Sequence, residues 1–329
     1  MSSGQVLRFG ILTAAHLHAW SYVAAMRERD DATVVGLWDD NVERGEDFAQ
    51  KAGIPFVGYL DDLLAAVDVV AITSENNRHA ELAEIAAKAG KHILCEKPLV
   101  ARQEDADRMT AAVNAAGVKL MTAFPCRFSP AYQRMKERVA AGEIGPIKAI
   151  AATNRGRCPF GWFVEPALSG GGAMIDHVVH VTDLLRDLLG EEPATVQAQI
   201  GNNVYGEKWE DTAMVTLQFP SGIFATLDSS WSRPQNFKTW GDVTMTVVGE
   251  KGVMELDMFG PGIDFYHPGS TTHTMAGYGT NLDGLMVDAI VKACLDGTDV
   301  PVTMHDGLQA ARVAMAGYRS VSEGQPVAV

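Results

Sequence analysis

Apolar runs alternate with amphipathic segments along the first third of the chain. The runs are short and β-branched or aliphatic, which is typical of buried strands, and the segments between them have helical periodicity. Strands are expected at Leu7–Leu12, Thr33–Trp38, Val67–Thr73, His92–Cys95 and Lys119–Ala123, and helices at Ala19–Arg29, Val42–Ala52, Glu81–Ala89 and Glu104–Ala116. Strand–helix repeats of this length predict a parallel, doubly wound sheet.

The pattern changes after about Pro125. From Thr195 to about His267, strands follow one another with little helix between them, which predicts an antiparallel sheet. A strand is also expected at Ile147–Ala152, and helices at Pro130–Ala140, Gly172–Leu189, Leu282–Leu295 and His305–Ser322. We therefore expect two domains, residues 1–125 and residues 126–329, the second an α/β domain with a large open, mainly antiparallel sheet. A sheet face that its own helices leave uncovered predicts a homodimer or homotetramer.

Composition narrows the class of partner. The chain has 329 residues and a formal net charge of −14, which argues against nucleic acid and anionic membranes as partners. Its four cysteines are scattered, as expected for free thiols in a reducing compartment. We find neither a signal-peptide pattern nor an apolar run near the roughly 18 residues of a membrane span. A cytoplasmic protein with a small-molecule substrate is expected.

Two polar motifs stand at the ends of predicted elements. Glu96-Lys97-Pro98 follows a strand that Pro98 must end, so Lys97 reaches the carboxyl edge of the sheet, where ligands bind. Three glycines from Gly170 open a helix that carries Asp176 and His180, which share a face at spacing i, i+4. Lysine, carboxylate and imidazole on rigid elements suit proton transfer to and from a hydroxyl. The alternative is that Asp176 and His180 lie on a solvated helix face.

With these motifs the chain resembles the glucose–fructose oxidoreductase / inositol dehydrogenase (Gfo/Idh/MocA) family. Further matches are Arg127-Phe-Ser-Pro130, Asp183 three residues after His180, Ser229-Ser230-Trp231, and the tail from Asp306-Gly307 to Ser320. The resemblance covers essentially the whole chain. It implies a Rossmann-like domain that binds NAD or NADP, an α/β domain whose open sheet forms the oligomer interface, and oxidation of sugars or cyclitols. It also implies that Lys97 follows the fifth strand.

One departure concerns the glycine-rich loop after the first strand. The G-x-G-x-x-G pattern is missing, and the one glycine that remains, Gly10, lies inside the strand. A dinucleotide is still expected to bind, because a helix N-terminus offers amides to an anion and Thr13 offers a hydroxyl. The cofactor-binding residues expected in this loop are Thr13, Ala14, Ala15 and His16.

Further cofactor contacts are expected at three other strand ends. Asp39 is placed to accept hydrogen bonds from a ribose and to repel a 2′-phosphate, which favours NAD over NADP; the alternative is a turn aspartate. Glu96 is expected to contact the nicotinamide ribose or to fix Lys97. After the strand at Val67–Thr73, contact with the cofactor is expected; the alternative, compatible with it, is that Asn77 caps the next helix. The candidate contacts there are Thr73, Ser74, Asn77 and His79.

The substrate-binding candidates combine aromatic, basic and catalytic side chains. Aromatic faces stack on the C–H faces of sugar rings, and arginines bind hydroxyls or acids. Besides Lys97, Asp176 and His180, the candidates are Arg127, Arg157, Trp162, Phe163 and His177. No metal is expected, although His16, His18 and His177 have side chains that bind metals elsewhere.

These residues predict an NAD-dependent oxidoreductase acting on a secondary alcohol or ketone of a sugar, cyclitol or related polyol. His180 takes the hydroxyl proton, Asp176 stabilises the charged imidazole, and Lys97 polarises the oxygen or relays the proton. One alternative is an enzyme that keeps NAD bound and uses transient oxidation for glycoside cleavage or elimination. Another is a non-catalytic sensor of dinucleotides or sugars.

Overall fold

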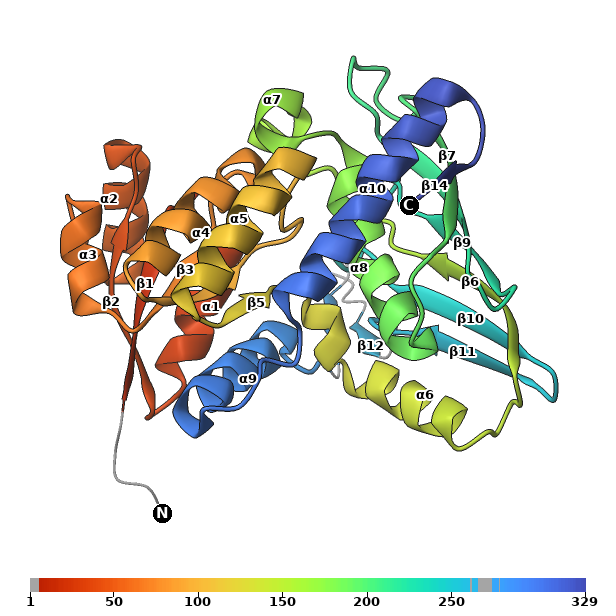
Figure 1. Cartoon of the computed structure of the whole chain (residues 1–329), viewed down its shortest axis with the longest axis horizontal. Coiled ribbons are helices and arrows are strands. Elements are labelled where there is room, and N and C mark those ends of the chain that lie inside the picture. Colours follow the sequence, from red (N-terminus) through yellow and green to blue (C-terminus); the bar gives the residue numbers. More distant parts are fainter. Residues whose placement is uncertain (1–5, 261, 266–273, 278) are drawn as a thin grey trace. The chain divides into compact units, whose positions relative to one another are not determined.

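The computed structural model describes residues 6–260, 262–265, 274–277 and 279–329, and it forms two compact units (Figure 1). Unit 1 comprises residues 1–125, 167–170 and 282–308, and unit 2 comprises residues 126–166, 171–281 and 309–329. The strand region expected to end near residue 267 therefore has its last residues outside the described ranges.

The sheet of unit 1 has five parallel strands in the order β2-β1-β3-β4-β5. The strands are β1 Leu7–Leu12, β2 Ala32–Trp38, β3 Val69–Ile72, β4 His92–Cys95 and β5 Leu120–Thr122. Chain order reverses between β1 and β3, and such a switch point creates the crevice where ligands bind. Lys97 follows β4, the fourth strand and not the fifth. Between β2 and β3 the described chain forms no further strand of this sheet, only an isolated bridge between Leu37 and Phe56.

Six helices accompany this sheet within the described residues of unit 1. They are α1 His18–Arg27, α2 Val42–Ala52, α3 Leu60–Ala66, α4 His79–Lys88, α5 Gln103–Ala116 and α9 Leu282–Asp296, with a short 3-10 turn η1 Asn76–Arg78 before α4. Helix α2 ends at Gly53, whose φ of 64° is a left-handed C-cap conformation. The sequence pattern assigned α9 to the second domain, but α9 packs against α1, and its Asp288 pairs with Arg29, two residues beyond the end of α1.

The main sheet of unit 2 has seven strands in the order β11-β10-β6-β9-β8-β7-β14. Only β6 and β9 pair in parallel, so the prediction of a mainly antiparallel sheet is confirmed. The strands are β6 Ile147–Thr153, β7 Thr195–Gly201, β8 Thr212–Gln218, β9 Phe224–Asp228, β10 Thr244–Gly249, β11 Val253–Asp257 and β14 Val327–Ala328. A separate antiparallel pair is formed by β12 Gly262–Phe265 and β13 Thr274–Gly277.

One face of this sheet is covered by helices, as Figure 1 shows. Along β8 the buried Ala213, Val215 and Leu217 alternate with outward residues such as Met214, which is 59% exposed. On β9 Phe224 is 49% exposed, so the outward face keeps large apolar side chains in solvent. The helical elements of unit 2 are α6 Pro130–Ala140, α8 Ala173–Leu189 and most of α10 Met304–Glu323, with the short η2 Pro125–Phe128 and η3 Gly161–Val164. The short α7 Pro166–Ser169 belongs to unit 1 except for its first residue.

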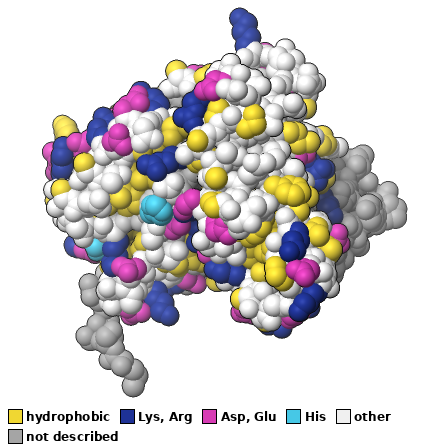
Figure 2. Space-filling view, turned by 45° about the vertical axis from the view of Figure 1, so that its right-hand side comes forward, with side chains coloured by type: hydrophobic (Ala, Val, Ile, Leu, Met, Phe, Trp, Pro, Cys, Tyr) yellow, Lys and Arg dark blue, Asp and Glu magenta, His cyan; other side chains and the backbone are white. Residues whose placement is uncertain are grey.

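Charges of both signs are mixed over the surface. Figure 2 shows Lys and Arg side chains interspersed with Asp and Glu side chains over the face in view. Among the described residues, every helix is too short or too polar to cross a bilayer.

Candidate active site

The loop after β1 makes its turn without glycine. Thr13 adopts a φ of 67°, a left-handed conformation that is uncommon for a β-branched residue. Two reciprocal hydrogen bonds hold it there: the Thr13 hydroxyl donates to the Thr73 carbonyl at 3.0 Å, and the Thr73 hydroxyl donates to the Thr13 carbonyl at 2.6 Å. Thr13 and Thr73 follow β1 and β3, so these bonds close the switch point of the sheet.

Asp39, at the end of β2, is buried and fully engaged within the protein. Its carboxylate accepts from the Ala14 amide at 2.8 Å and from two nitrogens of Arg44 at 2.9 and 2.8 Å. Arg44 also pairs with Glu75 at 2.8 Å. Burial opposes the charge on Arg44, but the hydrogen bonds and charges of Asp39 and Glu75 raise its pKa above the usual range. The loop and the end of β2 thus form one ionic network, and the contact of Asp39 with a ribose stays a prediction.

The segment after β3 is tied down by side chains. His79 is fully buried, with Nδ1 2.9 Å from the Pro98 carbonyl and Nε2 3.3 Å from the Ser74 carbonyl. Burial lowers the pKa of His79, and because a neutral ring has one N–H it donates to only one of these two carbonyls. Asn77 donates to the Ala167 carbonyl at 2.9 Å, and α4 starts at an uncapped Arg78, so the reading of Asn77 as a helix cap is wrong.

Glu96 lies at the centre of a buried polar cluster. It accepts from the Tyr22 hydroxyl, from His18 Nδ1 at 3.0 Å and from the Lys97 amide at 3.1 Å, and His16 Nε2 is 3.9 Å away. Burial opposes ionisation, but the neighbouring His16 and His18 rings and the His18 hydrogen bond lower the pKa of Glu96 below its usual range. An ionised Glu96 therefore fixes the backbone of Lys97, whose side chain is itself buried.

His16, His18 and Glu96 also form a group with metal-ligand spacing, found in the part of the chain that the structure describes. One ligand atom from each lies within 4.8 Å of the others. However, His16 Nδ1 accepts the His18 amide hydrogen at 3.1 Å, so the ring proton of a neutral His16 resides on Nε2. A metal at Nε2 would require both ring nitrogens to be deprotonated. The arrangement fits a hydrogen-bond network better than a metal centre.

Unit 1 also fits the phosphate end of a dinucleotide. The β1–α1 loop lies at the switch point, and the positive end of the α1 dipole attracts anions, although the first amides of α1 are bonded to His16 and Leu17. Of the expected loop contacts, Thr13 and His16 are buried, and Ala14 and Ala15 are half-buried.

Helix α8 of unit 2 carries the second half of the predicted machinery. Every residue from Ala173 to Arg186 is buried, including Asp176, His180 and Asp183. The alternative of a solvated polar face is therefore wrong. Ionisable groups persist in such a helix only when they are hydrogen-bonded or paired, since unpaired burial is costly.

Asp176 is held by its sequence neighbour His177 and by Trp231, a contact that the sequence did not indicate. Its Oδ2 accepts from the indole N–H of the buried Trp231 at 3.0 Å and lies 3.2 Å from His177 Nε2. The His177 ring packs on Gly156, where a β-carbon would stand 2.4 Å from Cε1. His177 thus supports the carboxylate, and the expected pairing of Asp176 with His180 stays a prediction.

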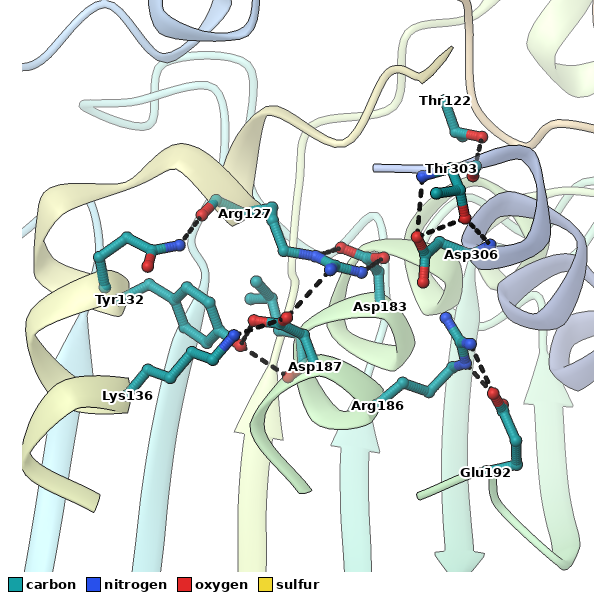
Figure 3. A network of polar contacts seen from close by, with 12 residues as sticks. Thr122, Arg127, Tyr132, Lys136, Asp183, Arg186, Asp187, Glu192, Thr303 and Asp306 are labelled. Carbon is teal, nitrogen blue, oxygen red and sulfur yellow. Dashed lines mark hydrogen bonds and ion pairs between the residues drawn. The ribbon is translucent and has the colours of Figure 1, made fainter. Parts of the chain in front are cut away.

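Arg127 of η2 binds two carboxylates in the C-terminal half of α8 (Figure 3). Its Nε donates to Asp183 at 2.9 Å and its Nη1 to Asp187 at 3.0 Å. The Asp187 carboxylate also accepts hydrogen bonds from the Tyr132 hydroxyl at 2.7 Å and from Lys136 Nζ at 2.7 Å, both on α6. Breaking a buried pair of this kind typically costs about 3–5 kcal/mol. These contacts account for Arg127 as an anchor of α8, and its role in substrate binding stays a prediction.

The glycines before α8 make room for two other elements. A β-carbon on Gly171 would stand 1.9 Å from the Tyr318 hydroxyl, and one on Gly172 would stand 2.2 Å from the Glu210 carbonyl oxygen. The Glu210 carboxylate accepts from the Gly172 amide at 2.5 Å and from Tyr318 at 2.6 Å. Glu210 and Tyr318 were missed at the sequence level, because they lie 38 and 146 residues from Gly172 and carry no local motif.

The aromatic candidates form a cluster near the start of α8. Trp162 stacks on Phe163 with ring centroids 3.8 Å apart, and both pack against a core that includes Trp231. Arg157 donates to the Gln235 carbonyl at 2.9 Å and lies 4.8 Å above the Trp240 ring. Their contacts with a substrate stay predictions.

Comparisons with known proteins identify the family. Residues 8–124 match the model of an oxidoreductase family with an NAD-binding Rossmann fold, and residues 132–255 match the GFO/IDH/MocA C-terminal domain. A myo-inositol 2-dehydrogenase from Thermotoga maritima is 33% identical over 240 residues, 69% of each chain. A 2,7-anhydro-N-acetylneuraminate hydratase from Escherichia coli is 30% identical over 265 residues, 77% of this chain and 68% of that one.

The fold comparison extends over the whole chain. The crystal structure of GenD2 from gentamicin A biosynthesis, in complex with NAD, superposes with a TM-score of 0.90 at 24% identity and covers 100% of this chain and 98% of that one. The resemblance noted in the sequence is therefore confirmed, and the chain belongs to the GFO/IDH/MocA family of NAD-binding oxidoreductases.

Proposed function

We propose that the protein transfers a hydride between NAD and a secondary alcohol or ketone of a sugar, cyclitol or related polyol. The observation that carries the proposal is the burial of Asp176 and His180 on α8, with the Asp176 carboxylate held by an indole N–H. Burial of a carboxylate and an imidazole is costly unless they are paired or hydrogen-bonded. Buried ionisable groups of this kind cluster at functional sites. The myo-inositol dehydrogenase relative supports a cyclic polyol as substrate.

The chain's own residues would handle the proton. Bound NAD supplies the hydride acceptor, and oxidation of a CH–OH group also releases the hydroxyl proton. His180 takes this proton, and Lys97 polarises the hydroxyl oxygen as negative charge develops on it. Asp176 favours the charged form of the imidazole. Glu96 fixes the Lys97 backbone through its 3.1 Å hydrogen bond.

A second function remains open because one relative is a hydratase. In that case NAD would stay bound, and transient oxidation would activate a neighbouring C–H bond for elimination or glycoside cleavage. The two functions differ in their balance of electrons. Net accumulation of NADH with substrate supports the dehydrogenase, whereas turnover without a change in nicotinamide absorbance supports the alternative.

The test is steady-state kinetics on a panel of sugars and cyclitols. Protein variants are then assayed with the substrate that reacts. We expect Lys97→Ala and His180→Ala each to lower kcat by at least about 100-fold while NAD affinity stays within a few-fold. The exposed Lys88→Ala and His305→Ala serve as matched controls and should keep full activity. Near-normal turnover of the His180 variant would show that α8 is not the catalytic helix.

We also propose that the protein is a homodimer or homotetramer formed through the outward face of the large sheet. Met214 and Phe224 are exposed there and favour association. Light scattering should give a multiple of 35.4 kDa, and Met214→Glu should lower it. Val42→Glu changes an apolar residue of unit 1 that is 54% exposed and should leave the mass unchanged. A wild-type monomer would refute the proposal. A cytoplasmic location also stays a prediction.

A further inference from the structure

The β1–α1 loop uses most of its backbone amides internally. Thr13 N–H donates to the Trp38 carbonyl at 2.7 Å, and Ala14 N–H donates to Asp39 at 2.8 Å. His16 N–H donates to the Thr73 carbonyl at 2.9 Å, and His18 N–H donates to His16 Nδ1 at 3.1 Å. In a glycine-rich loop, amides of this segment face the diphosphate of the dinucleotide. Here a side chain has to supply much of the positive charge that the diphosphate requires.

The position of His18 makes it the best placed of the nearby cations. Arg44 is committed to Asp39 and Glu75, Arg78 pairs with Asp40 at 2.6 Å, and the His16 side chain is only 2% exposed. His18 is the first residue of α1, and its side chain is 27% exposed.

The geometry of the His18 ring leaves it a second donor. Nδ1 is bound to Glu96 at 3.0 Å. The two imidazole nitrogens lie on opposite sides of the ring, so Nε2 of a charged His18 has a proton to offer elsewhere.

The surroundings of His18 determine its charge. Burial disfavours the charged form, but Glu96 and Asp283 of α9 outweigh burial and the opposing charge of Lys97, and the pKa of His18 is raised. The other ionisable neighbours are His16, with ring centroids 4.4 Å apart, and Tyr22, at 6.0 Å. His18 therefore keeps its proton to a higher pH than an ordinary histidine does.

We infer that His18, oriented by Glu96, contacts the diphosphate of NAD and supplies by its side chain what backbone amides supply in glycine-rich loops. Glu96 acts here as a positioning residue for both His18 and Lys97. Hydrogen bonds that involve a charged group are stronger than neutral ones, so loss of this contact should be visible in affinity alone.

The test measures binding to the full chain without substrate. His18→Ala should weaken both NADH, followed by fluorescence, and ADP-ribose, followed by calorimetry, by about 10-fold or more. His92→Gln, at the opposite edge of the sheet, is the control and should bind both normally. Unchanged affinity in His18→Ala would overturn the inference. So would weakened NADH with unchanged ADP-ribose, because that result assigns His18 to the nicotinamide end.

A pH series on the unmodified protein makes the test independent of how the variant folds. A charged His18 binds diphosphate better than a neutral one. ADP-ribose affinity should therefore fall as the pH rises through the pKa of His18, whereas adenosine affinity should not. His18→Lys, which keeps a cation, should bind ADP-ribose at high pH better than His18→Ala. A flat pH profile for ADP-ribose in the unmodified protein would overturn the inference.

Discussion

Two loops of this protein solve related problems in opposite ways. The β1–α1 loop of unit 1 contains no glycine and holds Thr13 at a φ of 67° with hydrogen bonds to Thr73. The loop before α8 in unit 2 keeps its glycines, and the Tyr318 hydroxyl and the Glu210 carbonyl fill the space next to Gly171 and Gly172. The first loop requires a left-handed backbone conformation, whereas the second requires residues without a β-carbon.

The difference between the two loops indicates under which conditions another residue can replace glycine. A left-handed φ costs a non-glycine residue of the order of 1–3 kcal/mol, which a few hydrogen bonds offset. A β-carbon within 2 Å of another heavy atom forces the backbone or its neighbour to move. The first loop therefore accommodates side chains with chemistry of their own, those of Thr13, His16 and His18. Replacement at the second loop would change the packing of α8.

The largest effect is expected at Gly171. Gly171→Ala should destabilise the protein by about 3 kcal/mol, because the new methyl group would overlap Tyr318. Denaturant unfolding measures this loss of stability. Gly58→Ala is the control, because a β-carbon added at Gly58 would have no heavy atom within 4 Å. Equal stability of the two variants would show that Tyr318 moves freely and that the comparison between the loops fails.

A smaller effect is expected at Asp39, which binds the first loop to β2. Asp39→Ala removes the repulsion of a 2′-phosphate and releases two nitrogens of Arg44. The affinity for NADPH relative to NADH should rise about 10-fold, equivalent to about 1.4 kcal/mol. Fluorescence titration measures both, and Asp47→Ala on the exposed side of α2 should leave the ratio unchanged. An unaltered ratio in the Asp39 variant would mean that this carboxylate does not set cofactor choice.

The smallest effect separates conformation from bonding at Thr13. Thr13→Ala keeps the strained φ and loses the hydroxyl, so it should cost about 1 kcal/mol of stability. Thr13→Gly loses the same bond but relieves the strain, so its stability should stay within about 0.5 kcal/mol of the unmodified protein. Thermal unfolding of both variants gives the answer. If glycine is as damaging as alanine, strain at Thr13 is negligible.

The fold was predictable where local signals were strong. Helices α2 and α6 have the predicted bounds, because Gly53 ends one and Pro130 starts the other. Helix α3, at Leu60–Ala66, was missed because seven residues hold too little periodicity to distinguish it from a loop. The assignment of α9 to unit 1 depends on tertiary contacts with α1, which a sequence pattern does not encode.

The candidate site was predictable only in its principal residues. Lys97, Asp176 and His180 stand in motifs that a reader can find along the chain. Their supports come from elsewhere: Tyr22 and His18 reach Glu96, and Trp231 reaches Asp176 from 55 residues away. These contacts form because helices and strands far apart in the sequence pack together, so the spacing of residues along the chain does not predict them.

The division into units has a consequence for biosynthesis. The chain passes from one unit to the other after residues 125, 166, 170, 281 and 308, so neither unit is one continuous stretch. As the chain leaves the ribosome, the five strands of the first sheet emerge early, but α9 follows more than 150 residues after β5. Until then the surface of α1 that receives α9 has no cover, and a nascent chain stalled before residue 282 should expose an apolar surface that chaperones recognise.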